Sequence, residues 1–250
     1  MSSVKLLTIA TINLNNATGL QRTINSFKVL RKFNDIEFIF QDGNSSDESL
    51  NVAEQFYSKE EIVSERDRGI YDAMNRTLHR GTGKFIIWIN SGDEFLPNVI
   101  EIIFKTLKFI DNGIVSCGFE IHSDTDSRFI AYSKPSYKDL PYGTLPHPAT
   151  FFLREDLIQI GGYDETYKIA SDRDLILKLF FRKSCILFLD AVISKFYIGG
   201  ISASRSLWLE NIKINKKYNL ISTTRFFILT IRYYLSSFSW LSKHIRLYHH

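Results

Sequence analysis

The chain has 250 residues, 44% of them hydrophobic, which suffices for one well-packed domain or a domain with an appendage. Its net charge of +4 comes from 31 basic and 27 acidic residues, a balance that argues against a nucleic-acid partner. Its two cysteines, Cys117 and Cys185, provide no disulfide framework, and both lie in apolar runs that favour small buried hydrophobes over metal ligands.

The chain shows no plain targeting or membrane-spanning segment. Its first residues lack the long apolar stretch and the small-residue cleavage site of a signal peptide. It also lacks a run of about 18 uncharged apolar residues, the length that a membrane span needs. We therefore expect a cytoplasmic protein.

Strands and helices alternate four times in the first part of the chain. Apolar runs predict strands at 4–10, 36–40, 62–63 and 85–89, and helical spacing predicts helices over 20–30 and 70–79. Ser45 and Glu48 have the spacing of a capping box, which predicts that another helix opens there. Such alternation predicts a parallel sheet with right-handed crossovers.

Polar residues follow each of these strands. They are Thr11 and Asn13, then Asp42, then Asp67 and Arg68, and finally Gly92 and Asp93. Because open α/β sheets bind ligands at the carboxyl ends of their strands, we expect these residues to share one site. Asp93 offers oxygen to a hard divalent cation, and Gly92 lets a phosphate or metal approach the backbone closely. The same Ser-Gly-Asp sequence is also common turn chemistry.

A glycine-rich phosphate loop is absent after the first strand. Neither G-x-G-x-x-G nor a Walker A sequence occurs there, so a nucleotide would be held by side chains and a metal.

The second part of the chain is less regular. We expect a helix over 97–110, strands at 114–121 and 128–133 joined by a hairpin turn, and last strands within 186–198. Asp124 and Asp126 in the hairpin resemble a metal motif, although Asp and Ser are also favoured in solvated turns. His147, just before an apolar run at 149–153, either faces a cleft or serves the fold.

Asp172 lies just before a helical run at 175–181. A helix dipole stabilises an anion at this position, and an ionised carboxylate suits a general base acting on a sugar hydroxyl. Asp174 is its nearest rival. The alternative for Asp172 is an N-cap, a role that Ser171 could also fill.

Together these segments resemble the family-2 inverting glycosyltransferases, which have the GT-A-type fold, an α/β Rossmann-like mixed sheet flanked by helices. The resemblance covers roughly residues 4–205. It is most specific over residues 64–93, SERDRGIYDAMNRTLHRGTGKFIIWINSGD, which is similar to the subgroup that builds bacterial surface polysaccharides.

The chain departs from the family pattern at three places. The family's Asp-Asp-Gly-Ser-Thr-Asp loop appears as residues 41–47, QDGNSSD, in which Gln41 replaces the first Asp and leaves Asp42 for the base or ribose. The metal motif Asp-x-Asp appears as Ser91-Gly92-Asp93, with one carboxylate. The Glu-Asp pair before the late helix appears as Ser171-Asp172.

The resemblance implies a nucleotide-sugar donor, most often a UDP-sugar, and a divalent cation, Mn²⁺ or Mg²⁺, on Asp93. Asp172 would act as the base of a single displacement that inverts the anomeric configuration. The acceptor would be an undecaprenyl-diphosphate-linked saccharide in O-antigen, capsule or exopolysaccharide biosynthesis. The implied substrate and nucleotide contacts are Thr11, Asn13, Asp42, Asp67, Arg68, Asn75, Gly92 and His147.

The end of the chain is apolar and basic, so we expect a transferase domain at 1–205 and a helical tail at 206–250. At helical spacing, Arg225 and Arg232 share a polar arc, and Phe227 points the other way. Such a helix suits a membrane interface and a peripheral location on the inner face of the cell membrane. The alternative is packing on the transferase domain or on a second copy in a homodimer.

Two other functions compete with sugar transfer. A nucleotidyltransferase can share this sheet, but it usually carries a Gly-rich loop with Lys or Arg after the first strand, and residues 11–16 contain none of these. A non-catalytic sugar- or membrane-binding scaffold predicts that replacing Asp93 or Asp172 leaves function intact.

Overall fold

The structure is a computed structural model that describes residues 5–122, 145–197 and 206–233. The chain divides into two compact units, residues 1–200 and 201–250, and each is described here by itself. Asp124, Asp126, the expected strand at 128–133 and residues 234–250 of the tail lie outside the described residues.

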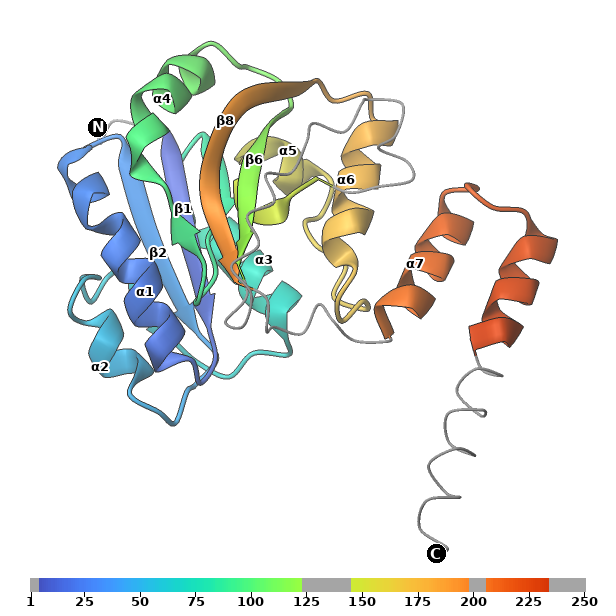
Figure 1. Ribbon diagram of the computed structural model, residues 1–250, viewed down its shortest axis with the longest axis horizontal. Helices are drawn as coiled ribbons and strands as arrows, with labels where there is room; N and C mark the ends of the chain where they lie inside the picture. The colour runs from blue at the N-terminus through green and yellow to red at the C-terminus, as the bar shows by residue number, and fades with distance from the viewer. Residues whose placement is uncertain (1–4, 123–144, 198–205, 234–250) are drawn as a thin grey trace, which may run out of the picture. The chain divides into compact units, whose positions relative to one another are not determined.

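The first unit contains an eight-stranded sheet in the order β3-β2-β1-β4-β7-β6-β8-β5 (Figure 1). Its strands are β1 (Leu7–Asn13), β2 (Ile36–Asp42), β3 (Ile62–Ser64), β4 (Phe85–Trp88), β5 (Glu94–Phe95), β6 (Ile114–His122), β7 (Thr150–Leu153) and β8 (Ile186–Tyr197). Its α-helices are α1 (Ala17–Phe27), α2 (Ser49–Ala53), α3 (Ile70–Arg80), α4 (Ile100–Lys108), α5 (Arg154–Gln159) and α6 (Ser171–Phe181). Short 3-10 helices are η1 (Lys28–Lys32), η2 (Pro97–Val99) and η4 (His147–Ala149).

The predicted parallel arrangement of the first four strands is confirmed. β1 pairs in parallel with β2 and β4, and β2 pairs in parallel with β3. β1, β2 and β4 are buried almost throughout, which explains their unbroken apolar runs.

β7 reverses direction in the middle of the sheet. It is antiparallel to both β4 and β6, and β6 is parallel to β8. The carboxyl ends of β6 and β8 therefore lie at the same edge of the sheet as those of β1 to β4. β5 closes the sheet antiparallel to β8.

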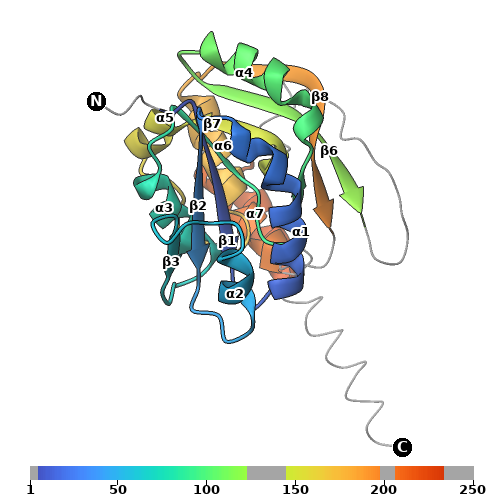
Figure 2. The same ribbon diagram turned by 90° about the vertical axis from the view of Figure 1, so that its left-hand side faces the viewer.

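Two apolar cores lie on opposite faces of the sheet, covered by different helices (Figures 1 and 2). The first core contains side chains of α1, α2 and α4, such as Leu20 and Leu107. The second core contains side chains of α3, α5 and α6, such as Met74 and Leu175, together with Trp88 of β4.

Some element bounds differ from the expectation. β1 begins at Leu7 and continues to Asn13, because its whole length pairs with β2, up to Asn13 opposite Asp42. The expected helix at 20–30 ends as an α-helix at Phe27 and continues as η1. The helix with Asp172 begins earlier than expected, at Ser171, so this carboxylate lies in its first turn.

The second unit contains α7 (Ser206–Lys217) and a further helix over 223–233. Trp208 stacks on Tyr233 with ring centroids 5.5 Å apart, which joins the two helices. Phe227, Ile228 and Ile231 are 58%, 59% and 57% exposed. Among the helices that the structure describes, none has the length and apolar character needed to cross a bilayer.

Candidate active site

Asp42, the last residue of β2, is a buried carboxylate that is saturated by the protein's own donors. Its Oδ1 accepts hydrogen bonds from Asn13 Nδ2 at 2.9 Å and Ser45 Oγ at 2.6 Å. Its Oδ2 accepts from the Ser45 backbone N–H at 2.8 Å and Ser64 Oγ at 2.7 Å. Burial alone would raise the pKa of Asp42, but the hydrogen bonds from Ser45, Asn13 and Ser64 outweigh it and lower the pKa. Asp42 is therefore an anion that organises the ends of β1, β2 and β3.

The expected capping box is wrong, because Asp42 takes the side chain on which it depended. Ser45 Oγ bonds Asp42, whereas α2 begins four residues later, at Ser49, with Glu48 in the N-cap position. The capping-box pattern takes into account only residues in the first turn of the helix. Here Ser45 Oγ binds a carboxylate outside that turn, and this charged group is the stronger partner.

Thr11 and Asn13 lie within β1 rather than in the loop expected after it. Thr11 is fully buried, and its hydroxyl donates to the Ile89 carbonyl at 2.9 Å, so it connects β1 to the end of β4. Asn13 donates to Asp42 and Ser45 through Nδ2, while its buried Oδ1 has no hydrogen-bond partner in the described structure. Asn13 Oδ1 is thus an acceptor at the edge of the sheet that none of the described groups uses.

The segment after β3 is held by a network of charges. Asp67 Oδ1 accepts from Gly69 N at 3.0 Å, and Asp67 Oδ2 lies so close to Gly43 that a Cβ there would be 2.6 Å away. Burial raises the pKa of Asp67. Arg68 forms ion pairs with Asp72 at 3.0 Å and Glu165 at 2.7 Å, and its side chain is 74% exposed. Arg68 is therefore tethered to α3 and to the segment before α6.

Asn75 of α3 fixes the turn before α6. Its Nδ2 donates to the Tyr163 carbonyl at 3.0 Å, and its Oδ1 accepts from the Tyr163 N–H at 2.9 Å. The turn itself needs glycine, because Gly162 has φ +65° and a Cβ there would be 2.5 Å from Asn75 Oδ1. Both ends of the amide are engaged in the fold, which favours packing and positioning for Asn75.

Asp93 ends the turn that follows β4, and it is only 8% exposed. Thr23 of α1 shapes this turn, since its hydroxyl donates to the Asp93 carbonyl at 2.7 Å and accepts from Gly92 N at 3.0 Å. Gly92 has φ +111°, which a side chain would strain. Tyr197 N donates to Asp93 Oδ1 at 3.3 Å. Burial raises the pKa of Asp93 to about 7, opposed by the Tyr197 N–H and by Arg22.

The oxygen atoms in this turn fit a hard cation. No group of three His, Cys, Asp or Glu side chains gathers within residues 5–122, 145–197 and 206–233. Mg²⁺ and similar cations, however, are usually held by one or two carboxylates together with substrate phosphates and water. Asp93 supplies one carboxylate, and Asn90 in the same turn has a buried Oδ1 without a partner among the described groups. Asp93 can thus supply one carboxylate to a cation whose other ligands would be substrate phosphate and water.

Tyr163 links Asp172 to the end of β4. Its ring stacks on Tyr71 with centroids 5.4 Å apart and meets Trp88, the last residue of β4, edge to face at 5.3 Å. Burial raises the pKa of Tyr163 well above its ordinary value, and the neighbouring charge of Asp172 adds to the rise. Because Tyr71 OH also donates to the Ile169 carbonyl at 2.5 Å, the amino ends of α3 and α6 lie together. The amino end of α6, with Asp172 in its first turn, therefore lies near the end of β4.

His147 belongs to this aromatic cluster. Its Nε2 hydrogen-bonds Tyr163 OH at 2.5 Å, and its ring lies 5.6 Å from that of Trp88. Burial lowers the pKa of His147 to about 4, so the ring is neutral near pH 7. It supports Tyr163, and contact between His147 and a substrate stays a prediction.

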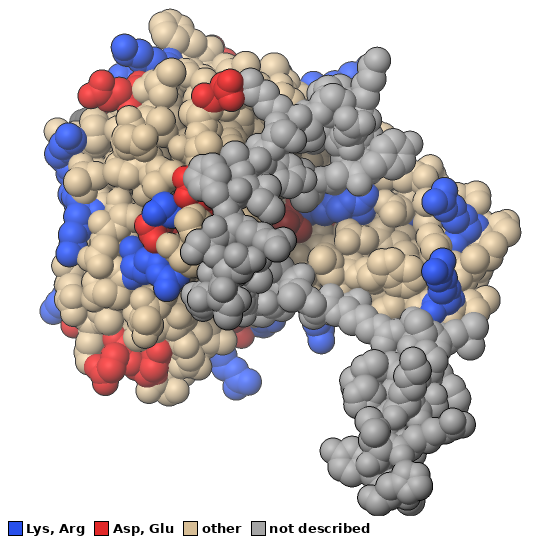
Figure 3. Space-filling model, in the orientation of Figure 1, with Lys and Arg blue, Asp and Glu red and all other residues tan. Residues whose placement is uncertain are grey.

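Sequence reasoning missed several residues around these carboxylates. Thr23 and Arg22 lie in α1, where nothing in the pattern distinguishes them from other helical positions. Arg22 donates to the Gly92 carbonyl at 3.4 Å, and its guanidinium lies 3.9 Å from the Tyr197 ring centroid. Tyr163 follows two consecutive glycines, a signal of close backbone approach that would have found it. On the face in Figure 3, acidic and basic side chains lie close together near the middle.

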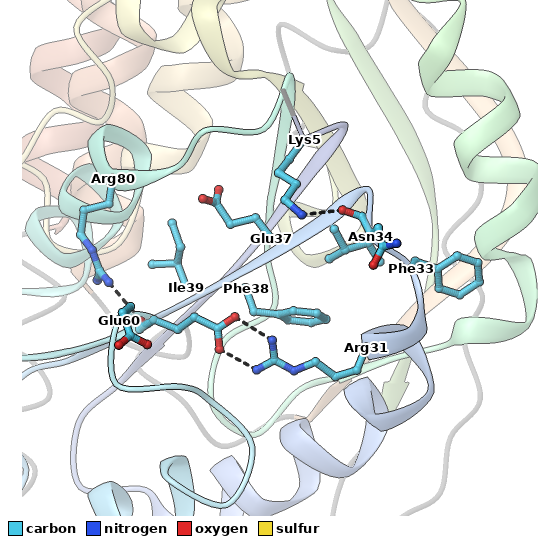
Figure 4. Close-up of a pocket in the computed structure, with 11 residues that line it drawn as sticks. Lys5, Arg31, Phe33, Asn34, Glu37, Phe38, Ile39, Glu60 and Arg80 are labelled. Atoms are coloured by element: carbon cyan, nitrogen blue, oxygen red, sulfur yellow. Dashed lines mark hydrogen bonds and ion pairs between the residues drawn. The ribbon is translucent and has the colours of Figure 1, made fainter. Parts of the chain in front are cut away.

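A separate hollow of about 520 Å³ lies at the other end of β2, lined by residues such as Lys5, Arg31, Glu37 and Arg80 (Figure 4). Arg31 is bound to both carboxylate oxygens of Glu61, at 2.6 Å each, and Lys5 donates to the Asn34 carbonyl at 2.6 Å. Because it adjoins Ile36, where β2 begins, this hollow is distinct from the edge that carries Asp42 and Asp93.

Comparison with known proteins agrees with this geometry. The family model described as "Glycosyl transferase family 2" matches residues 8–185. An uncharacterized glycosyltransferase of Mycobacterium tuberculosis is 30% identical over 191 residues, covering 71% of this chain and 70% of the relative. A PGL/p-HBAD biosynthesis glycosyltransferase of Mycobacterium bovis is 25% identical over 178 residues, or 67% of this chain and 68% of the relative.

Solved structures show the same fold. S. aureus TarS in complex with UDP-GlcNAc aligns with a TM-score of 0.69 at 13% identity, over 94% of this chain and 73% of that one. Mannosyltransferase PcManGT from Pyrobaculum calidifontis, in complex with GDP-Man and Mn²⁺, aligns with a TM-score of 0.62 at 15% identity, over 89% and 66% of the chains. The fold is therefore of the GT-A type, and the chain belongs to glycosyl transferase family 2.

Proposed function

We propose that the protein is a metal-dependent, inverting glycosyltransferase that moves one sugar from a nucleotide donor, a UDP-sugar, to a lipid-linked glycan of a bacterial surface polysaccharide. The observation that supports this proposal is the set of Tyr71 and Tyr163 contacts, which bring the amino end of α6, with Asp172 in its first turn, near the last residue of β4. The UDP-sugar complex of TarS and the Mn²⁺ complex of PcManGT support the choice of donor and cation.

In the proposed reaction, Asp172 removes the proton from an acceptor hydroxyl. The hydroxyl oxygen forms a bond to the anomeric carbon while the bond between that carbon and the diphosphate oxygen breaks, so the nucleoside diphosphate leaves with the electron pair. Attack from the face opposite the leaving group inverts the configuration. The first turn of α6 favours the ionised form that a base requires.

The other side chains hold and orient the donor. Asp93 and Asn90 would bind the cation, which when present neutralises charge on the diphosphate. Asp42 fixes Asn13, whose unpartnered Oδ1 is an acceptor for a nucleotide base. Asp67, with the segment that Arg68 tethers, forms the neighbouring wall of the site.

The test measures sugar transfer by the purified protein. Two quantities are followed: the release of sugar from UDP-sugars, and the formation of product on lipid-linked saccharides extracted from membranes. Asp172→Asn should reduce turnover by about 100-fold or more, the range expected for loss of a general base, with UDP affinity nearly unchanged. Asp93→Ala should remove the Mn²⁺ dependence of UDP binding. Asp156→Asn is a matched control. Asp156 is a carboxylate of α5 whose Oδ2 accepts a hydrogen bond from Gly113 N at 3.3 Å.

The outcome separates the competing functions. A scaffold predicts that both variants behave as the parent protein, and a nucleotidyltransferase predicts diphosphate release from a nucleoside triphosphate. If Asp172→Asn retained most of the turnover, Asp172 would not be the base, and Asp174 would be tested next.

We also propose that the unit 201–250 associates with the inner face of the cell membrane. Phe227, Ile228 and Ile231 form one exposed apolar stripe on the helix 223–233, and the exposed Arg232 lies beside it. An apolar stripe next to a cation suits an interface with anionic lipid. Ile228→Asn should reduce sedimentation of the full chain with phosphatidylglycerol vesicles, whereas Thr224→Asn should not. Unchanged sedimentation together with a shift from dimer to monomer would instead identify the stripe as a homodimer contact.

A further inference from the structure

Five polar side chains form a row on one face of β5, β8 and β6. Glu94 and Glu120 both lie opposite Lys195, and His122 lies opposite Tyr197. Because alternate residues of a strand share a face, all five project to the same side of the sheet. Phe95, Phe119, Ile121 and Phe196 alternate with them and pack into the first apolar core. The polar row therefore projects from the opposite face of these strands.

The row is built by internal hydrogen bonds. Tyr197 OH donates to Glu94 Oε1 at 2.5 Å, and Lys195 Nζ donates to Glu94 Oε2 at 3.4 Å. His122 Nε2 and Glu120 Oε2 are 2.7 Å apart. These contacts fix the orientation of the imidazole and of both carboxylates.

The residues that the structure describes leave part of the row's hydrogen-bonding capacity unused. Within the described part of the chain, Glu120 Oε1 and His122 Nδ1 make no hydrogen bond, and Lys195 Nζ makes only one. The side chains of Glu120, His122 and Lys195 are 14%, 25% and 28% exposed. These side chains are partly exposed, as side chains that line a binding site are.

The row adjoins the turn that carries Asp93. Tyr197 donates its backbone N–H to Asp93 Oδ1, and Glu94 is the next residue in the chain. Arg22 covers the ring of Tyr197 and thereby closes this end of the row. The unused donors and acceptors therefore begin beside the residue that would hold the diphosphate of the donor.

The chemistry of the row fits a neutral molecule with many hydroxyl groups. A hydroxyl both donates and accepts, so it can satisfy Glu120 Oε1 as donor and Lys195 as acceptor. Two carboxylates beside one lysine disfavour an anion such as a free phosphate. Hydrogen bonds to charged groups are also the stronger kind, which makes such a row selective for hydroxyl positions.

We propose that Glu120 and His122 bind hydroxyl groups of a sugar substrate and so contribute to sugar specificity. The inference rests on the proposed transferase function. The sugar is either the one carried by the donor or the terminal sugar of the acceptor, since both meet next to the diphosphate during transfer.

The experiment compares Glu120→Gln and His122→Asn with the parent protein, with Glu37→Gln as a control. Glu37 is a strand carboxylate of β2 that bonds Thr8 Oγ1 at 2.7 Å and belongs to the other end of the sheet. Calorimetry with Mn²⁺ measures the affinity for UDP, UDP-glucose, UDP-galactose and UDP-N-acetylglucosamine. Initial rates give KM for the membrane-extracted acceptor. Melting temperatures report whether each variant is folded, and the two substitutions test the row independently.

Binding of the donor sugar predicts that both variants weaken the affinity for the preferred UDP-sugar about tenfold while the affinity for UDP is unchanged. Binding of the acceptor predicts a KM for the acceptor that rises about tenfold with donor affinity unchanged. If the parent protein transfers sugar and both folded variants match it in every constant, the inference is wrong and the proposed function stands. If the parent protein binds neither UDP nor a UDP-sugar, the proposed function fails and the inference fails with it.

Discussion

Replacing Asp42 by asparagine should destabilise the protein markedly although the two side chains have the same shape. The carboxylate accepts four hydrogen bonds, two at each oxygen, from Asn13, Ser45 and Ser64. An asparagine keeps one acceptor oxygen, but an NH₂ group, which is a donor, replaces the other. This NH₂ group faces two of these partners, which are themselves donors. Ser64 and the Ser45 hydroxyl can rotate to accept, but the Ser45 backbone N–H cannot. The Asn13 amide can accept only by a flip that moves its Nδ2 to the buried position of Oδ1, where no partner is described.

The magnitude follows from these partners. If the new NH₂ replaces Oδ2, it faces the Ser45 N–H, and if it replaces Oδ1, it faces Asn13 Nδ2. Either orientation leaves one buried donor without an acceptor, which costs about 1–3 kcal/mol, and the remaining bonds lose their charge assistance. We expect a loss of about 3 kcal/mol in the free energy of unfolding, equivalent to a fall of about 6–12 °C in melting temperature for a chain of this size.

Urea unfolding followed by circular dichroism measures this loss. Asp35→Asn is the control, because Asp35 is 52% exposed and its ion-pair partner Lys108 is 3.8 Å away. The control should lie within about 0.5 kcal/mol of the parent protein. A loss below about 0.5 kcal/mol for Asp42→Asn would show that the hydrogen bonds around Asp42 do not hold the three strand ends together.

Two further predictions concern the cluster around Tyr163. The pKa of His147 is lowered to about 4, so the folded protein binds fewer protons than the unfolded chain between pH 6.5 and pH 4. His147 should therefore cause no loss of stability above pH 6.5 and a loss of up to about 1.4 kcal/mol per pH unit as the pH falls through that window. His147→Gln should remove this part of the slope in urea unfolding at successive pH values, and equal slopes would contradict a buried neutral ring. Gly162→Ala adds a Cβ 2.5 Å from Asn75 Oδ1 at φ +65°, whereas Gly161→Ala adds one at φ +79° with nothing within 4 Å. We expect Gly161→Ala to lower stability by about 1 kcal/mol through backbone strain alone and Gly162→Ala to lower it by about 1–3 kcal/mol more. Equal melting temperatures for the two variants would show that the turn yields without disturbing Asn75.

The sequence was most informative where burial is complete. β2 and β4 are largely apolar and buried on both faces, so their apolar runs predicted them within a few residues, and glycines bound the run of β4 on both sides. The alternation with helices then predicted the parallel pairing and the common edge. Asp42 and Asp93 became candidates because each lies within four residues after such a run.

Features that depend on distant partners were not predictable. β5 has two residues, Glu94 and Phe95, and exists because they pair with Lys195 and Ser194, about a hundred positions away. Thr23 lies in an amphipathic helix, and its importance comes from the turn at Gly92 that it contacts. Short-range patterns carry no information about such contacts. The capping-box prediction failed at Ser45 for the same reason.

The position of β7 separates two parts of the sheet. Asn13 and Asp42 lie on the neighbouring strands β1 and β2, on the β4 side of β7, whereas Glu120 and Lys195 lie on β6 and β8, which pair with one another beyond β7. The two groups share no direct strand pairing, and within the described residues the step from Asp93 to Glu94 connects them along the chain at this edge. Mutations in β6 and β8 can therefore accumulate without altering the backbone pairing of β1 to β4. Such a division allows one half of the protein to diversify over evolution while the other is retained.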